Sequence, residues 1–205
     1  MSLIIEMKIE LPYFYIENSL GGQQEWLPEY MMRVGGCAAV TACDCSIYFE
    51  LYKNLHGLYP FDKKKILKTD YIKFTGEMKP YLHPRWSGID KLSIYIEGFG
   101  KFLKDRGEND LQILGWEGDA NFESTHMILK YQIDNGYPVP CLTLNHKNPV
   151  MEDYVWHWFL LTGYEIVGND WYVKAVSYGY GKWLNFDLLW DTGFDKKGGL
   201  IIFRR

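Results

Sequence analysis

A cysteine at the start of a predicted helix is the residue best suited to nucleophilic chemistry. Cys37 follows Gly35 and Gly36. Apolar residues then recur every four positions, as on one face of a helix that we expect to run from about residue 37 to 54: Ala39, Cys43, Ile47 and Leu51. Unpaired backbone N–H groups and the positive end of the helix dipole favour a thiolate at this position, so we expect the pKa of Cys37 to be lowered.

The backbone around this cysteine suits acyl chemistry as well. The N–H of Cys37 could donate to a developing oxyanion, and the two preceding glycines are expected to let a substrate backbone approach closely. A small apolar cysteine packed at a helix start is the structural alternative.

A histidine in a strongly apolar segment is the second candidate. His157 stands between Trp156 and Trp158 in a predicted strand over residues 154–166. A buried imidazole needs hydrogen-bond partners, and a satisfied core histidine is the alternative to a catalytic one. The other histidines occur in loop-like or helical contexts and are interpreted as surface or structural: His56, His83, His126 and His146.

The two candidates together indicate a nucleophile and its base. A cysteine that opens a helix early in the chain, with a histidine on an apolar strand 120 residues later, is an arrangement suited to this pair. The imidazole would take the thiol proton and later protonate the leaving group.

The remaining cysteines predict no metal site and no disulfide. Cys43 and Cys45 are two residues apart on the predicted helix and therefore point about 200° apart. We expect neither a metal nor a cofactor. The N-terminal residues lack the pattern of a signal peptide, and no apolar stretch reaches the ~18 residues of a membrane span. A cytoplasmic protein with reduced thiols is therefore expected.

Composition excludes several other classes. Hydrophobic residues make up 47% of the 205 residues, which is enough to bury a sizeable core. The formal net charge of −4 lacks the basic field of a nucleic-acid-binding protein. The single basic run, Lys63–Lys65 with Lys68, is interpreted as a solvated face.

The order of predicted elements indicates an α+β fold in a single domain, 1–205. A mainly helical lobe is expected over about 30–135, and a β lobe over about 137–205 together with N-terminal strands. The predicted helices are 37–54, 69–79, 89–105 and 121–134. The predicted strands lie in 3–16, 110–116, 137–145, 154–166, 171–178 and 199–204, with a hairpin turn at Gly168-Asn169-Asp170.

Four segments resemble the papain-like cysteine peptidases, and most closely the bacterial branch of bacteriocin leader-processing (double-glycine) peptidases. They are GGCAAVTACDC at 35–45, DNGYPVPCLTL at 134–144, DYVWHWFLLTGYE at 153–165 and VKAVSYGYG at 173–181. The resemblance implies a helix that carries the nucleophile Cys37, packed against a C-terminal antiparallel sheet that carries the base His157. It also implies a cytoplasmic bacterial thiol hydrolase.

The chain departs from that family at two positions. Met31 stands where the family has its oxyanion glutamine, and Val176 stands where it has the residue that orients the histidine. Gln23 or Gln24 is a candidate replacement for the first group.

Ser177 is a candidate for the histidine-orienting group. A two-residue turn within 167–170 would place Val176 and Tyr178 on the same face as His157, whereas a bulge or a three-residue turn would bring Ser177 there. Packing by Trp156 or Trp158 is another way to orient the ring.

Three functions follow as hypotheses. The first is a cysteine peptidase or amidase that forms an acyl-enzyme, and the second is an acyl- or peptidyl-transferase on the same scaffold. The third is a non-catalytic descendant that binds peptide. The expected partner is a peptide or a small acyl compound, with no nucleic acid and no membrane span. The sequence leaves the oligomeric state open.

Overall fold

The structure, a computed structural model, describes residues 6–205. Its helices are α1 (Tyr30–Gly35), α2 (Cys37–Tyr52), α3 (Lys68–Met78), α4 (Leu92–Asp105), α5 (Phe122–Asp134) and α6 (Phe186–Trp190), with short 3-10 helices at Gln24–Trp26 and Pro149–Tyr154. Its strands are β1 (Glu6–Glu10), β2 (Tyr15–Ile16), β3 (Ser19–Leu20), β4 (Gln112–Glu117), β5 (Val139–Thr143), β6 (His157–Val167), β7 (Asp170–Ser177), β8 (Tyr180–Asn185) and β9 (Gly199–Arg204). The part of the predicted 3–16 strand region before residue 6 lies outside the described residues.

The strands other than β2 and β3 form an antiparallel sheet in the order β4-β9-β5-β6-β7-β8, which β1 joins by pairing with β6. β2 and β3 pair with each other in a separate two-stranded sheet. The α+β class is therefore confirmed. β6 is the central strand, because β5 pairs with its first half and β1 with its second half. A strand covered on both faces has no polar side, which explains why residues 157–164 are all buried.

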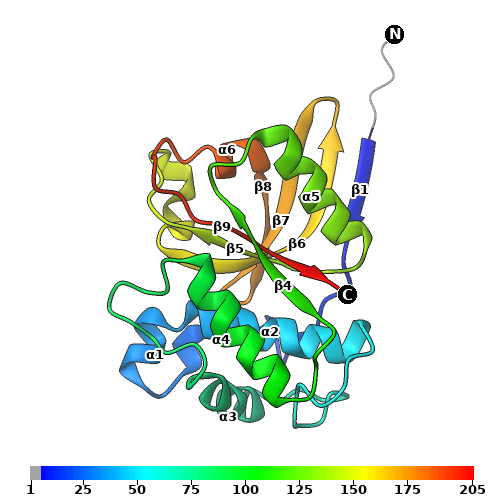
Figure 1. Cartoon of the computed structure of the whole chain (residues 1–205), viewed down its shortest axis with the longest axis vertical. Coiled ribbons are helices and arrows are strands. Elements are labelled where there is room, and N and C mark those ends of the chain that lie inside the picture. Colours follow the sequence, from blue (N-terminus) through cyan, green and yellow to red (C-terminus); the bar gives the residue numbers. More distant parts are fainter. Residues whose placement is uncertain (1–5) are drawn as a thin grey trace.

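Helices α1–α4 gather in the lower half of Figure 1, and the strands with α5 and α6 make up the upper half. α5 packs against β1, β5 and β6, and β4 belongs to the large sheet. The Gln132 side chain connects α5 to the sheet, because it forms hydrogen bonds with both the N–H and the C=O of Phe203 in β9. α1–α4 therefore precede the strands β4–β9, and α5 lies with the sheet.

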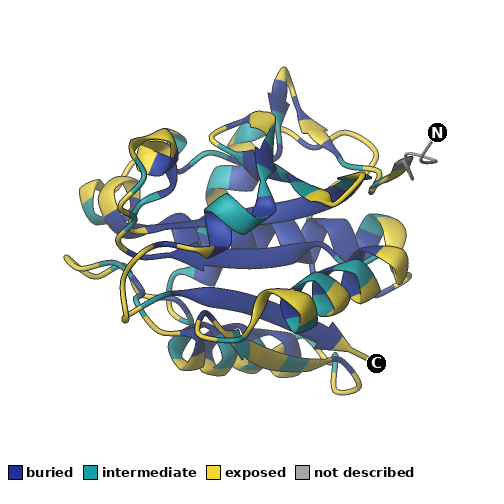
Figure 2. Ribbon diagram, turned by 90° about the horizontal axis from the view of Figure 1, so that it is seen from above, coloured by how far each residue is buried: buried dark blue, intermediate teal, exposed yellow. Residues whose placement is uncertain are grey.

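α2 runs through the interior between the other helices and the sheet. Thirteen of its 16 residues are buried, and it packs against both β6 and α3. A helix can be enclosed on all sides only if it is apolar or small nearly all round, and α2 is rich in alanine and cysteine. Figure 2 shows the buried residues concentrated in the middle of the molecule, with exposed residues in the outer helices and loops.

Among the residues that the structure describes, no helix combines the length and the apolar character that crossing a bilayer would require.

Candidate active site around Cys37 and His157

Cys37 is the first residue of α2, as expected, but its surroundings differ from the expectation. The residue is only 5% exposed. Burial raises the pKa of the Cys37 thiol, and hydrogen bonds from the backbone at Trp158, Ala38 and Cys37 itself oppose that shift without reversing it. The predicted lowering of this pKa is therefore wrong, because loss of hydration outweighs the N-terminal position on the helix.

The two glycines before Cys37 serve the packing of the chain itself. A Cβ atom at Gly36 would lie 2.2 Å from the carbonyl oxygen of Met32, and one at Gly35 would lie 2.6 Å from that of Arg85. Backbone atoms cannot move aside as a flexible side chain can. These glycines therefore allow α1 and the 85–88 turn to approach α2, and they do not leave room for a substrate backbone as expected.

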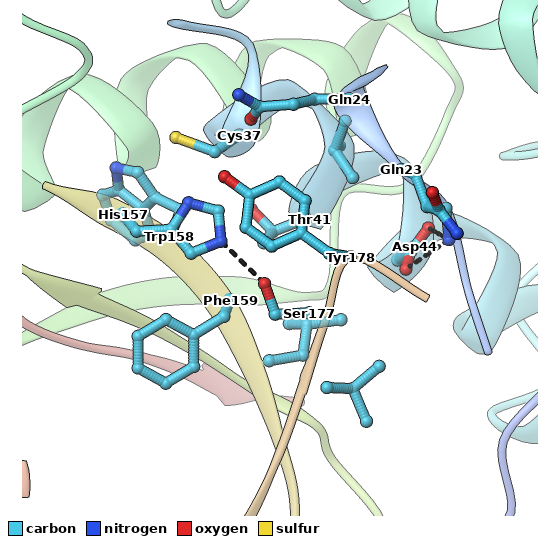
Figure 3. Close-up of a pocket in the computed structure, with 14 residues that line it drawn as sticks. Gln23, Gln24, Cys37, Thr41, Asp44, His157, Trp158, Phe159, Ser177 and Tyr178 are labelled. Atoms are coloured by element: carbon cyan, nitrogen blue, oxygen red, sulfur yellow. Dashed lines mark hydrogen bonds between the residues drawn. The ribbon is translucent and has the colours of Figure 1, made fainter. Parts of the chain in front are cut away.

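His157 is the first residue of β6, and its ring is held by a hydrogen bond and by stacking on an aromatic side chain. Its Nε2 lies 2.7 Å from Ser177 Oγ. Its ring stacks on that of Tyr178, with centroids 4.7 Å apart and planes within 6°. Figure 3 shows the other ring nitrogen turned toward the sulfur of Cys37. Ser177 therefore takes up one nitrogen and leaves the second for the thiol.

A β-bulge brings Ser177 to this position. The β6–β7 hairpin closes with a two-residue turn, since Val167 pairs with Asp170. The register then shifts between Leu161 and Tyr164, so that Leu160 pairs with Val176. One extra residue reverses which face each later side chain occupies, which places Ser177 on the same face as His157. Of the two arrangements considered from the sequence, the bulged one is observed.

One cavity unites the candidate residues. Its lining includes Cys37, His157, Ser177, Gln23 and Gln24. Its volume is about 20 Å³, which is room for about one water molecule. Val176 also lines it, whereas Met31 does not. The structure thus brings together all the residues that the sequence nominates, around a cavity that has room for about one water molecule.

The two glutamines differ in their contacts. Gln24 is buried, donates from Nε2 to the carbonyl of Arg33 at 2.7 Å, and has no partner for its Oε1 within residues 6–205. Gln23 donates to Ser19 Oγ at 2.9 Å. Figure 3 shows the Gln24 amide beside Cys37 and the Gln23 side chain on the far side of the pocket. Gln24 is therefore the better placed of the two to meet an acyl group on Cys37.

Tyr178 is a residue of the site that was not among the candidate site residues predicted from the sequence. It forms a two-residue turn with Gly179 between β7 and β8, and the two residues have φ angles of 47° and 80°. Positive φ at both positions defines a tight turn that favours asparagine and glycine, so a tyrosine there is strained. The Tyr178 hydroxyl points toward Cys37 in Figure 3. The sequence signal that could have identified Tyr178 is a bulky residue at a turn position that normally takes asparagine.

The tryptophans on either side of His157 do not orient its ring. Trp158 is buried, donates to the carbonyl of Ile89 and stacks on Tyr95. Trp156 is 44% exposed and donates to Asn145, with a strained φ of 51°. The expected role in packing belongs instead to Tyr178. Backbone strain at residues 156 and 178, next to His157 and Ser177, is typical of functional sites.

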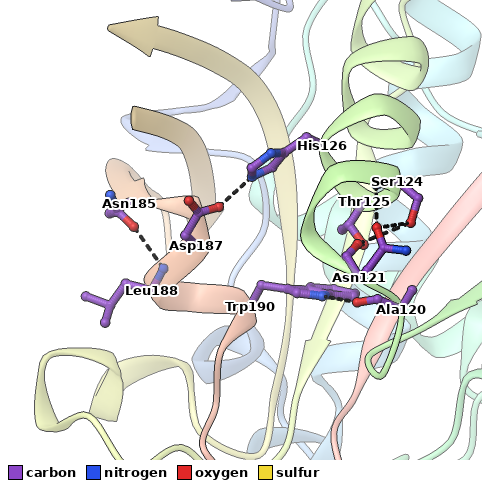
Figure 4. Close-up of polar contacts among 9 residues, drawn as sticks. All are labelled: Ala120, Asn121, Ser124, Thr125, His126, Asn185, Asp187, Leu188 and Trp190. Carbon is purple, nitrogen blue, oxygen red and sulfur yellow. Dashed lines mark hydrogen bonds and ion pairs between the residues drawn. The ribbon is translucent and has the colours of Figure 1, made fainter. Parts of the chain in front are cut away.

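The other histidines have structural or surface settings, as interpreted from the sequence. His126 of α5 is hydrogen-bonded to Asp187 at the start of α6 (Figure 4). The His126 ring also stacks on that of Trp171. His146 contacts the carbonyl of Leu188. These contacts fasten α5 and the 145–148 loop to α6. His56 and His83 are exposed.

The four cysteines are free and buried. Cys43 and Cys45 have no exposed surface and belong to the hydrophobic core. Across residues 6–205 the structure has no group of three or more His, Cys, Asp or Glu side chains arranged to hold a metal ion.

Comparison with protein-family models, with curated proteins and with solved structures gives no match. The geometry of the site and the chemistry of its residues are therefore the basis for a functional proposal.

The protonation states of the pair predict a particular pH dependence. Burial lowers the pKa of His157 to about 4 and raises that of Cys37, so at pH 7 both groups are neutral. We expect alkylation of Cys37 by iodoacetamide to rise about tenfold per pH unit from pH 6 to 9, because the thiolate fraction rises by that factor below the pKa. Peptide mass spectrometry across this range measures the rate, and a plateau from pH 5 to 8 would instead mean a preformed thiolate–imidazolium pair.

Proposed function

We propose that the protein is a cysteine-dependent acyl-transfer enzyme of papain-like architecture that hydrolyses a peptide or amide bond. The observation that carries the proposal is the shared cavity of Cys37 and His157, in which Ser177 holds the imidazole by its far nitrogen. Two further features support it. The cysteine opens a helix that packs against an antiparallel sheet, and the four sequence segments that resemble papain-like peptidases occur in the family's order.

The reaction begins with two neutral groups. The thiol of Cys37 transfers its proton to Nδ1 of His157 as sulfur attacks the substrate carbonyl carbon. The resulting imidazolium is stabilised by Ser177, whose oxygen accepts a hydrogen bond from Nε2–H. When the C–N bond breaks, the imidazolium gives its proton to the leaving amine.

Hydrolysis of the acyl-enzyme reverses the proton transfers. His157 removes a proton from water, the hydroxyl oxygen attacks the thioester carbon, and the C–S bond breaks. The proton then returns to the sulfur of Cys37.

The oxyanion is met by the backbone N–H of Cys37 and by the Gln24 amide. Gln24 Nε2 donates one of its two hydrogens to the carbonyl of Arg33, so the second can be donated to the oxyanion. Its buried Oε1 has no partner within residues 6–205, so a substrate N–H entering the pocket would satisfy it.

The proposal is tested by trapping the acyl-enzyme. The protein is incubated with p-nitrophenyl acetate, and the acetylated residue is located by peptide mass spectrometry. We expect Cys37 to be acetylated first and the label to be lost with time, while Cys37→Ala shows no burst of p-nitrophenol. Acetylation of the four cysteines at equal, slow rates would contradict an enzymatic role and favour the non-catalytic peptide-binding alternative.

The same experiment separates hydrolase from transferase. If adding an amine acceptor such as glycinamide accelerates the loss of label and yields the acetylated amine, the acyl- or peptidyl-transferase alternative is favoured. Unchanged deacylation with acetate as the product supports the hydrolase. Burial of Cys37, which raises the pKa of its thiol, is the observation that favours the binding alternative.

A further inference from the structure

A buried carboxylate lines the same cavity and is not used in the proposed reaction. Asp44 lies seven residues after Cys37 on α2, and so on the same face of the helix, since seven residues make nearly two turns. It is 4% exposed. Within residues 6–205 no cation lies within ion-pair distance of it, so its charge is compensated by hydrogen bonds alone.

Three donors converge on this carboxylate from three different segments. The Tyr71 hydroxyl of α3 donates to Oδ1 at 2.7 Å, and the Tyr13 hydroxyl, from the segment after β1, donates to Oδ2 at 3.0 Å. The backbone N–H of Gly22 lies 3.2 and 3.1 Å from the two oxygens. Two phenols and a peptide N–H thus replace the water that burial removes.

The loop at residues 21–24 is built to reach this carboxylate. A Cβ atom at Gly21 would lie 2.4 Å from Asp44 Oδ2, and one at Gly22 would lie 1.9 Å from the hydroxyl of Tyr71. Only glycine allows the backbone to approach so closely. The residues that follow directly are Gln23 and Gln24, both of which line the cavity. Asp44 is therefore a direct attachment between α2 and the segment that carries the oxyanion amide.

We propose that Asp44 is a positioning residue, which holds Gly22 against α2 and thereby places the Gln24 amide beside Cys37. The inference rests on the proposed function for its catalytic consequence. The structural part of the inference, that Asp44 anchors the 21–24 loop, is supported by the hydrogen bonds alone.

The ionisation of the Asp44 carboxylate is expected to make the position of the 21–24 loop depend on pH. Burial raises the pKa of Asp44 to about 6, against the opposing effect of hydrogen bonds from Tyr71, Gly22 and Tyr13. The titratable groups near it are those two tyrosines, its neighbours Cys43 and Cys45 on α2, and Cys37 and His157, which line the same cavity. The tyrosines and the thiols have raised pKa values and that of His157 is about 4, so none of them titrates near pH 6. Protonation of Asp44 as the pH falls through 6 weakens its hold on Gly22.

Two chemical readouts separate positioning from a purely structural role. Acetylation of Cys37 by p-nitrophenyl acetate forms an oxyanion and needs Gln24, whereas alkylation by iodoacetamide forms none. We expect Asp44→Asn to slow acetylation about 10- to 100-fold, as for a misplaced oxyanion donor, and to change alkylation less than about threefold. In the wild type, the ratio of the two rates should fall below pH 6, and in Asp44→Asn it should stay flat. Equal losses in both reactions, or no loss in either, would overturn the proposal.

Hydrogen exchange tests the anchoring without reference to catalysis. In Asp44→Asn we expect faster exchange at residues 21–26 and unchanged exchange in β5 and β6. If that variant does not fold, the wild type compared at pH 5 and 7.5, after correction for intrinsic rates, should show the same local loosening. Unchanged protection of the loop overturns the inference, whatever the activity. Loosening of the loop in a protein that never acylates Cys37 would instead refute the proposed function and leave the anchoring role of Asp44 intact.

Discussion

Replacement of His157 by alanine is expected to slow acetylation of Cys37 about 10²- to 10⁴-fold at pH 7. The reason lies in the resting protonation state. Burial raises the pKa of the Cys37 thiol, so there is little thiolate at neutral pH, and attack needs a base that removes the proton in the transition state. His157 is neutral above about pH 4 and is therefore ready to act. The burst of p-nitrophenol in single-turnover experiments measures the effect.

Two matched variants make the result specific. His146→Ala removes an imidazole that contacts the carbonyl of Leu188 outside the cavity, and it should acetylate at the wild-type rate. Ser177→Ala removes only the partner of Nε2, and we expect a smaller loss of about 10- to 150-fold, since a hydrogen bond to a charged group contributes about 1.5–3 kcal/mol. A wild-type rate in His157→Ala would mean that the imidazole is a structural group.

Most elements of the fold could be predicted from the sequence. α2 through α5 were each predicted within about three residues, because each has several turns with a periodic apolar pattern. The missed elements include α1, β8 and α6, which have six, six and five residues. Elements this short carry little pattern and depend on contacts with distant parts of the chain, such as the pairing of β8 with β7.

The position of Ser177 could be predicted only as one of two alternatives. It depends on the bulge in β6, where Thr162 and Gly163 lie opposite Lys174 of β7. A Cβ atom at Gly163 would lie 2.7 Å from the carbonyl oxygen of Ile9 in β1. Glycine within an apolar strand is a signal for a bulge or a close backbone approach. The choice between the two alternatives could therefore have been argued from Gly163.

The electrostatic part of the site could not be read from the sequence. The position of Cys37 at the start of a helix favours a thiolate, but β6 and Tyr178 enclose the sulfur and remove its water. How much water a side chain keeps depends on tertiary packing, and desolvation is the largest cause of the shifts at Cys37, Asp44 and His157 alike. Local spacing carries no information about that quantity.

Removal of the Tyr178 ring is expected to expose the catalytic pair. In the described conformation this ring stacks on the imidazole, and the cavity beneath holds about one water molecule. A substrate can reach Cys37 only after the side chain swings away, which costs the stacking energy of about 0.5–1.5 kcal/mol together with lost burial. We therefore expect Tyr178→Ala to raise the alkylation rate of Cys37 by iodoacetamide about tenfold or more.

Comparison of two reagents distinguishes access from reactivity. N-Ethylmaleimide is larger than iodoacetamide, so the closed wild type should disfavour it strongly, and Tyr178→Ala should bring the ratio of the two rates close to that of free cysteine. A change in the pKa of Cys37 would raise both rates together and leave their ratio unaltered. Tyr178→Phe keeps the stacked ring and removes only the hydroxyl, and should retain the wild-type ratio.

The same substitution should affect acetylation in the opposite direction once access is no longer limiting. The stacked ring helps to hold His157 in line with the sulfur, and without it Ser177 and the more distant ring of Phe159 would be left to orient the imidazole. We expect Tyr178→Ala to acetylate Cys37 more slowly, relative to its own alkylation rate, than the wild type does. If both reagents and the ester react with Tyr178→Ala as they do with the wild type, the ring neither closes the pocket nor orients the base, and another segment must control entry to Cys37.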